Sequence, residues 1–166
     1  SASLVGSEMC IRDRCSSMQN SKNITSKDVK TNGSETFGNV VKTIMRNNGI
    51  TWEDIKLITE FSNDTINSLI NHYDITFGRL KVFRFMFALA LYIDVDIIYS
   101  LLTKAGICRT DTVISNTAYE ILEEIPEYLN EGKDELDPIQ YAIEKVNSYI
   151  ENKIENDRLA RMLKLH

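Results

Sequence analysis

Residues 63–71 contain a run of hydrogen-bonding side chains within a predicted helix: Asn63, Asp64, Asn67, Ser68 and Asn71. An asparagine amide can pair with both hydrogen-bonding groups on the major-groove edge of adenine, and each good bidentate pair contributes roughly 1–3 kcal/mol of discrimination. Asp64 can accept a hydrogen bond from the amino group of cytosine, although its charge repels the DNA backbone. These residues are therefore candidates for reading base edges in DNA. The alternative is an ordinary solvated polar face.

Affinity for DNA also requires contacts with phosphate groups. The best basic candidates lie on the first predicted helix and at the start of the fourth, and they are Lys42, Arg46, Arg79 and Lys81. Because four anchors are few, we expect moderate, salt-sensitive binding that dimerisation strengthens.

Caps and apolar spacing delimit the helices that would position these side chains. Apolar residues recur at helical intervals before residues 47–49, where Asn-Asn-Gly ends the first helix with residues that tolerate a left-handed backbone. Thr51 is a good N-cap for a second helix, and Asp54 completes a variant of the capping box. The apolar residues of the first helix are Phe37, Val40, Val41 and Ile44.

The second and third helices are short and closely connected. The second runs to about Thr59, and a break at residues 60–62 separates it from a third helix over 63–71 that Ser62 can cap. Two short helices joined by a turn this tight are the geometry of a helix-turn-helix. Their inward-facing residues are Ile55, Ile58, Ile66, Leu69 and Ile70.

The run from Gly49 to Asn71 resembles the Cro/phage-repressor class of helix-turn-helix proteins, often called the XRE family. The resemblance continues to Leu101-Leu102-Thr103-Lys104-Ala105-Gly106, which is similar to the ending of one branch of that family. It implies a lambda-repressor-like five-helix bundle that binds double-stranded DNA, with Trp52 and Ser62 added to the phosphate contacts. The positions that fit the family's pattern are Thr51, Glu53, Ile55, Thr59, Ser62, Thr65, Ile66, Leu69 and Asn71.

Three positions depart from the pattern of this family. Lys56 stands where the family has an alanine packed close to the third helix, and Glu60 replaces the turn glycine that adopts a positive φ without steric cost. Trp52 replaces a glutamine that often contacts a phosphate in the family. The fold is compatible with all three changes, whereas affinity for DNA depends more directly on them.

The chain beyond residue 76 is predicted to be helical throughout. A helix over 77–91 is apolar on two sides, so it needs a second partner, either the C-terminal region or another subunit. Further helices are expected over 95–105, over 116–129 and from Pro138, whose preceding Asp137 is a strong start signal. The last of these carries an apolar stripe that is compatible with a dimer seam or with packing onto the 77–91 helix. Residues 158–166 are expected to extend it. That stripe consists of Ile139, Ile143, Val146, Ile150 and Ile154.

Composition and charge exclude several classes of function. Residues 36–106 carry seven basic and seven acidic residues, whereas 107–166 carry seven and thirteen, a net charge of −6. Three cysteines and two histidines form no metal-spaced set, and no phosphate loop, nucleophile elbow or catalytic triad is present, so we expect neither an enzyme nor a cofactor or metal site. With no long apolar run and no secretory signal, a cytoplasmic protein without membrane association is expected.

Two N-terminal segments stand apart from the predicted domain. Residues 3–14 resemble the translation of a transposase-type sequencing adapter, so residues 1–17 are interpreted as adapter-derived, with a natural polar tail as the alternative. Residues 18–35 have almost no apolar side chain, and such a segment is expected to be a disordered arm or linker.

The sequence therefore predicts an all-α protein with a helix-turn-helix DNA-binding domain over 36–106 and an acidic helical extension over 107–166. The favoured function is a homodimeric, repressor-like regulator of transcription. The alternative is a protein-interaction module, such as an antitoxin or a phage accessory protein, whose acidic C-terminal half engages a protein partner.

Overall fold

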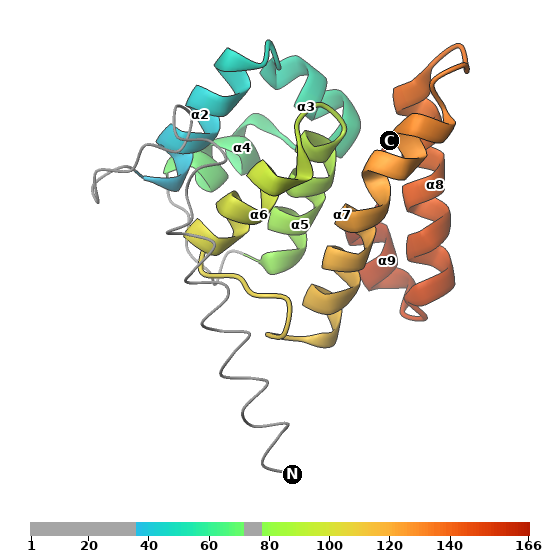
Figure 1. Cartoon of the computed structure of the whole chain (residues 1–166). Helices are drawn as coiled ribbons and strands as arrows, with labels where there is room; N and C mark the ends of the chain where they lie inside the picture. Colours follow the sequence, from blue (N-terminus) through green and yellow to red (C-terminus); the bar gives the residue numbers. More distant parts are fainter. Residues whose placement is uncertain (1–35, 72–77) are drawn as a thin grey trace.

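The computed structural model describes residues 36–71 and 78–166, and in these ranges all regular secondary structure is helical. The expectations for residues 1–17 and 18–35 lie outside the described residues. The all-α prediction is confirmed. The helices are α2 (Phe37–Asn47), α3 (Trp52–Thr59), α4 (Asn63–Asn71), α5 (Arg79–Ala90), α6 (Val95–Lys104), α7 (Val113–Glu131), α8 (Pro138–Lys153) and α9 (Asp157–Leu163) (Figure 1).

Local signals in the sequence set most helix boundaries. Gly49 follows α2 with a φ of 68°, and Gly106 follows α6 with a φ of 74°, so each supplies the left-handed residue that ends a helix. Asp137 caps α8 by accepting a hydrogen bond from the Gln140 N–H, and Pro138 occupies its first turn. Helix α5 begins at Arg79, because Gly78 has a φ of 109° and is not helical. The predicted start at residue 77 lies outside the described residues.

Helix α5 lies at the centre of the molecule. It packs against α3, α6, α7 and α9, and its two apolar stripes are both covered (Figure 1). Phe83 and Phe87 on one side and Phe85 and Met86 on the other are at most 1% exposed. The second partner that the sequence required is therefore the C-terminal region of the same chain.

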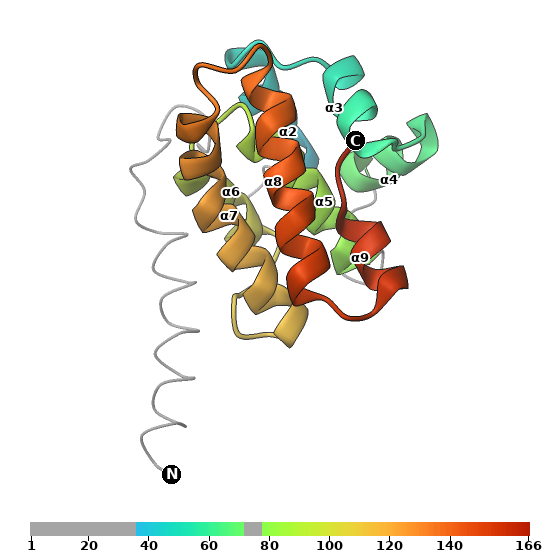
Figure 2. The same ribbon diagram turned by 90° about the vertical axis from the view of Figure 1, so that its right-hand side faces the viewer.

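Helices α7 and α8 form a hairpin beside α5 (Figures 1 and 2). Helix α7 begins at Val113, three residues before the predicted start, because Thr112 caps it by accepting from the Ser115 N–H. Four residues of the α8 apolar stripe are buried within the chain, and Ile139 is half-buried. The stripe packs chiefly against α7, whereas one of the two expectations was packing against α5.

The prediction that residues 158–166 extend α8 is wrong, because the C-terminal residues form a separate helix and an extended tail. Ile154 has an extended backbone that ends α8, and Asn156 caps α9. The tail then passes Asn147, whose amide forms two hydrogen bonds of 2.8 Å with the backbone of Leu165. The His166 N–H donates to the Ile58 carbonyl at 2.8 Å, so the tail reaches the end of α3 (Figure 2).

Helices α2 and α4 approach each other closely at Gly38. A Cβ atom built on this glycine would lie 1.9 Å from the carbonyl oxygen of Ile70, far inside the van der Waals limit. Because the obstructing atom belongs to the backbone, no change of side-chain rotamer relieves the clash. Gly38 is thus required for the position of α4 against α2.

We predict that Gly38→Ala destabilises the fold by about 3 kcal/mol, the upper end of the usual cost of overpacking. Denaturation by urea gives the free energy of unfolding. Asn39→Ala is the matched control, because Asn39 is the exposed neighbour on the same turn and should tolerate the change. Equal stability of the two variants would contradict the close approach.

Candidate nucleic-acid interface

A complete capping box fixes the start of α3. The Thr51 hydroxyl accepts from the Asp54 N–H at 3.1 Å, and the Asp54 carboxylate accepts from the Thr51 N–H at 3.0 Å. The same hydroxyl donates to that carboxylate at 2.7 Å. These hydrogen bonds lower the pKa of Asp54, with the Thr51 side chain as the largest cause and the Thr51 backbone next. The predicted capping box is therefore confirmed.

The connection between α3 and α4 contains a strained residue. Glu60 has φ 57° and ψ 23°, and it is the one non-glycine residue in the described ranges with a positive φ. Its N–H donates to the Lys56 carbonyl at 2.8 Å and closes the last turn of α3. The position thus has the left-handed backbone expected of the turn, with a glutamate where glycine would be free of strain.

Buried and stacked groups hold this turn in place. The Thr59 hydroxyl, fully buried, donates to the Ile55 carbonyl at 2.7 Å and accepts from the Phe61 N–H at 3.2 Å. The Arg84 guanidinium lies 5.8 Å from the centre of the Phe61 ring, a cation–π distance. The angle at which α4 leaves α3 is therefore determined by packing from α5 as well as by the turn itself.

Helix α4 has one buried face and one exposed polar face. Ile66, Leu69 and Ile70 are buried, as predicted. On the other side, the predicted base-contact residues Asn63, Asp64, Asn67 and Asn71 are all exposed, whereas Ser68 is half-buried. Ser62 caps the helix by accepting from the Thr65 N–H at 3.2 Å.

The asparagines of α4 line one wall of a groove of about 370 Å³, and residues of α2 and α3 line the other. The groove brings together five residues that the sequence predicted for DNA contact, three for bases and two for phosphates. Asp64 and Ser68 are not among the groove-lining residues. The lining consists of Lys42, Trp52, Lys56, Asn63, Ile66, Asn67, Ile70 and Asn71.

Trp52 connects this groove to the core. Its indole stacks on Phe85 of α5 with a ring separation of 6.3 Å and an interplanar angle of 24°. The side chain is half-buried and also lines the groove. One part of the ring therefore anchors the start of α3, while another part remains available to a molecule in the groove.

The remaining predicted phosphate contacts lie outside the groove lining. Arg46 is exposed in the last turn of α2, and Lys81 is half-buried in the first turn of α5. Arg79 forms an ion pair of 2.9 Å with Asp111, in the connection between α6 and α7. A contact between Arg79 and a DNA phosphate stays a prediction. It would require the phosphate to replace the Asp111 carboxylate as the partner of Arg79.

Sequence reasoning did not select Lys56 as a site residue. It lines the groove beside Lys42, with 27% of its side chain exposed, and its ammonium lies 2.6 Å from the Glu53 carboxylate. The resemblance treats Lys56 only as a departure from a packed alanine. Its position one helical turn after Trp52 was the available signal, because residues at this spacing share a helix face.

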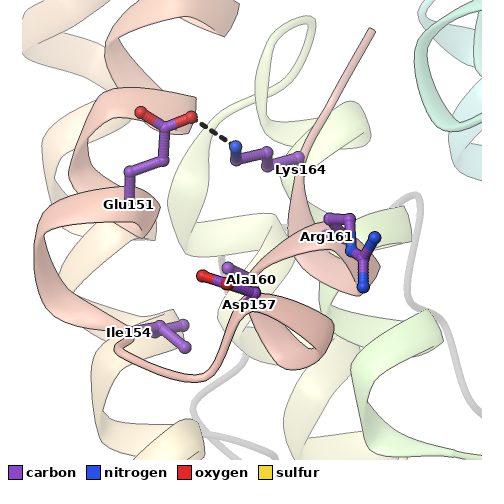
Figure 3. A pocket seen from close by; sticks show the side chains of 6 residues that line it. All are labelled: Glu151, Ile154, Asp157, Ala160, Arg161 and Lys164. Carbon is purple, nitrogen blue, oxygen red and sulfur yellow. Dashed lines mark hydrogen bonds and ion pairs between the residues drawn. The ribbon is translucent and has the colours of Figure 1, made fainter.

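A second pocket, of about 400 Å³, lies between α8 and α9 (Figure 3). Two of its charged residues, Glu151 and Lys164, form an ion pair, and Arg161 points away from that pair (Figure 3). Its two acidic and two basic residues balance, so it shows no charge preference for a ligand. The lining residues are Glu151, Ile154, Asp157, Ala160, Arg161 and Lys164.

No group of three or more metal-ligating side chains occurs among residues 36–71 and 78–166. No helix in the described part of the chain is long and apolar enough to cross a membrane. No family model, curated protein or solved structure matches this chain.

We predict that Thr51→Ala destabilises the protein by about 1 kcal/mol at neutral pH, the typical cost of losing an N-cap. The pKa of Asp54 should rise toward its ordinary value, since its largest hydrogen-bond partner is removed. A carboxyl group with a lowered pKa stabilises the fold above its ordinary pKa, and this contribution is lost as the pH falls through the lowered pKa. NMR titration of the Asp54 carboxyl group measures the shift.

Thr117→Ala is the control for this experiment, because Thr117 is a half-buried threonine within α7 that caps no helix and is far from Asp54 in the sequence. An Asp54 pKa that is the same in Thr51→Ala and in the unmodified protein would contradict the proposed cause.

We predict that Glu60→Gly stabilises the protein by about 1 kcal/mol, because glycine removes the cost of a left-handed backbone. Glu60→Gln is the control, since it removes the charge near His166 but keeps the strained conformation. Thermal and urea unfolding give the stability of each variant relative to the unmodified protein. If both variants change stability equally, strain at this position is not the cause.

Proposed function

We propose that this chain is a sequence-specific DNA-binding regulator of transcription with a lambda-repressor-like helix-turn-helix of the XRE type. The observation that carries the proposal is the groove between α2, α3 and α4. There, three exposed asparagines share one surface with two lysines and an indole. Amides can read base edges, and ammonium groups can contact phosphates, so one surface supplies both parts of DNA recognition.

In this proposal α4 enters the major groove of double-stranded DNA. Asn67, at the middle of α4, is placed to pair with a base, flanked by Asn63 and Asn71 one turn away on either side. Lys42 on α2 contacts the backbone of one strand, and Arg46 adds a second basic group at the end of the same helix. The capping box at Thr51 supports this geometry because it fixes the start of α3, the helix that precedes α4 and lines the same groove.

Binding as a homodimer is part of the proposal. A helix-turn-helix dimer places its two recognition helices in successive major grooves about one turn of DNA apart. The apolar stripes of α5 and α8 are buried within the chain, so contact between two copies uses other surfaces. Light scattering at increasing concentration tests this point independently of DNA binding.

The second candidate is a protein-interaction module, and charge is the observation that favours it. Residues 107–166 have a net charge of −6, whereas the helix-turn-helix unit, with seven basic and seven acidic residues, is neutral. A strongly basic patch is typical of proteins that bind nucleic acid. Absence of any DNA binding at low salt would favour this candidate over the regulator.

We predict that Asn67→Ala weakens specific DNA binding by about 5- to 150-fold, the equivalent of one bidentate base contact. Gel shifts with the DNA flanking its own gene give the dissociation constant. Asn130→Ala is the matched control, because Asn130 is an exposed asparagine on α7 and should bind like the unmodified protein. Identical affinity of the two variants would remove α4 from base recognition.

A further inference from the structure

The charges that line the groove are all positive. Lys42 and Lys56 contribute two ammonium groups, the three asparagines contribute neutral amides, and no carboxylate is among the lining residues. The groove is therefore suited to an anion that can also accept hydrogen bonds. The phosphodiester group has both properties, and it is the group that nucleic acids present along their whole length.

One of these charges is occupied by a residue from outside the groove. Glu53 is not a lining residue, and its side chain is 78% exposed, yet its carboxylate lies 2.6 Å from the Lys56 ammonium. Glu53 and Lys56 lie three residues apart on α3, so the pair forms within one helix. An ion pair this exposed holds its partner weakly.

We propose that Lys56 is an additional phosphate-binding residue and that Glu53 is an internal competitor for it. This inference rests on the proposed DNA-binding function and names a partner chemistry for the same groove. When DNA binds, a backbone phosphate replaces the Glu53 carboxylate at the Lys56 ammonium, and Glu53 turns to solvent. Lys42 on α2 lines the same groove, so its ammonium contacts the same stretch of DNA backbone.

This exchange gives the lysine at position 56 a function that an alanine could not perform. The half-buried stem of Lys56 packs in the groove, so only its ammonium has to change partner. The Glu53 carboxylate offsets one of the two positive charges of the groove. It also lowers the affinity for DNA, because breaking the ion pair is part of every binding event.

The test is fluorescence anisotropy with a labelled mixed-sequence duplex of about 24 base pairs, a little over two helical turns. Affinity is measured over a series of salt concentrations. In Lys56→Gln the slope of log Kobs against log salt should fall in magnitude by about 0.9, the value for one phosphate contact in B-DNA. Binding should weaken by about 8-fold at 0.1 M salt, which follows from the same slope.

Lys133→Gln is the matched control, since it removes one lysine charge from the exposed connection between α7 and α8. Its salt slope should stay that of the unmodified protein. Circular dichroism verifies that each variant is folded. Trp52 is the only tryptophan and lines the same groove, so its fluorescence should change when the duplex binds.

The competitor role has its own test. Glu53→Gln should bind the duplex more tightly than Glu135→Gln, which removes an equal charge from an exposed site far along the chain. This gain should disappear when Lys56→Gln is also present. A gain that persists in the double variant would show a general effect of net charge and would overturn the exchange.

The possible failures are distinguishable. If the unmodified protein binds and Lys56→Gln leaves the salt slope unchanged, this inference is overturned while the proposed function stands. If the duplex binds without a change in Trp52 fluorescence, the groove is not the contact surface, and the inference is again overturned. If the unmodified protein binds no duplex at low salt, both this inference and the proposed function are overturned. If Lys56→Gln fails to fold, the comparison of Glu53→Gln with Glu135→Gln is the test. Equal affinity of these two variants would overturn the inference.

Discussion

Burial of α5 is the constraint on which the rest of this structure depends. A helix with Phe83 and Phe87 on one side and Phe85 and Met86 on the other has apolar surface on two sides, and exposing it to water would be costly. It therefore needs helices around it, and the two halves of the chain supply them. Helix α3 covers one part, and α7 and α9 cover another, so a single core joins the polar α3–α4 unit to the C-terminal helices. The acidic extension is thus part of the same folded body as the groove.

This shared core explains why the turn between α3 and α4 is held from several directions. Glu60 adopts a left-handed backbone that a glutamate does not favour by itself. The buried hydroxyl of Thr59, the Arg84–Phe61 contact and the hydrogen bond from the His166 N–H to Ile58 all act within two residues of it. Strain at one position is tolerated where the surrounding contacts determine the conformation. The C-terminal tail is consequently part of what sets the geometry of the proposed reading helix.

The groove also shows how a neutral unit can present a positive surface. The total charge of residues 36–106 cancels, but the acids and bases are not mixed evenly in space. Lys42 and Lys56 line the groove, whereas Glu53 reaches it only through its ion pair, and Asp64 stays outside the lining. Local potential depends on which side chains share a cavity, so a balanced composition is a poor guide to the anion affinity of one surface.

The sequence by itself determined the elements whose signals are local. The cap at Thr51, the start at Asp137-Pro138 and the polar face of α4 follow from neighbours within one or two turns, and each was predicted correctly. Only the tertiary structure decided the rest. It placed the α8 stripe against α7, put Lys56 opposite Asn67 in one groove, required a glycine at position 38, and made residues 157–163 a separate helix. Those outcomes depend on contacts between residues far apart in the chain, and periodicity within a single helix carries no information about which distant face it will meet.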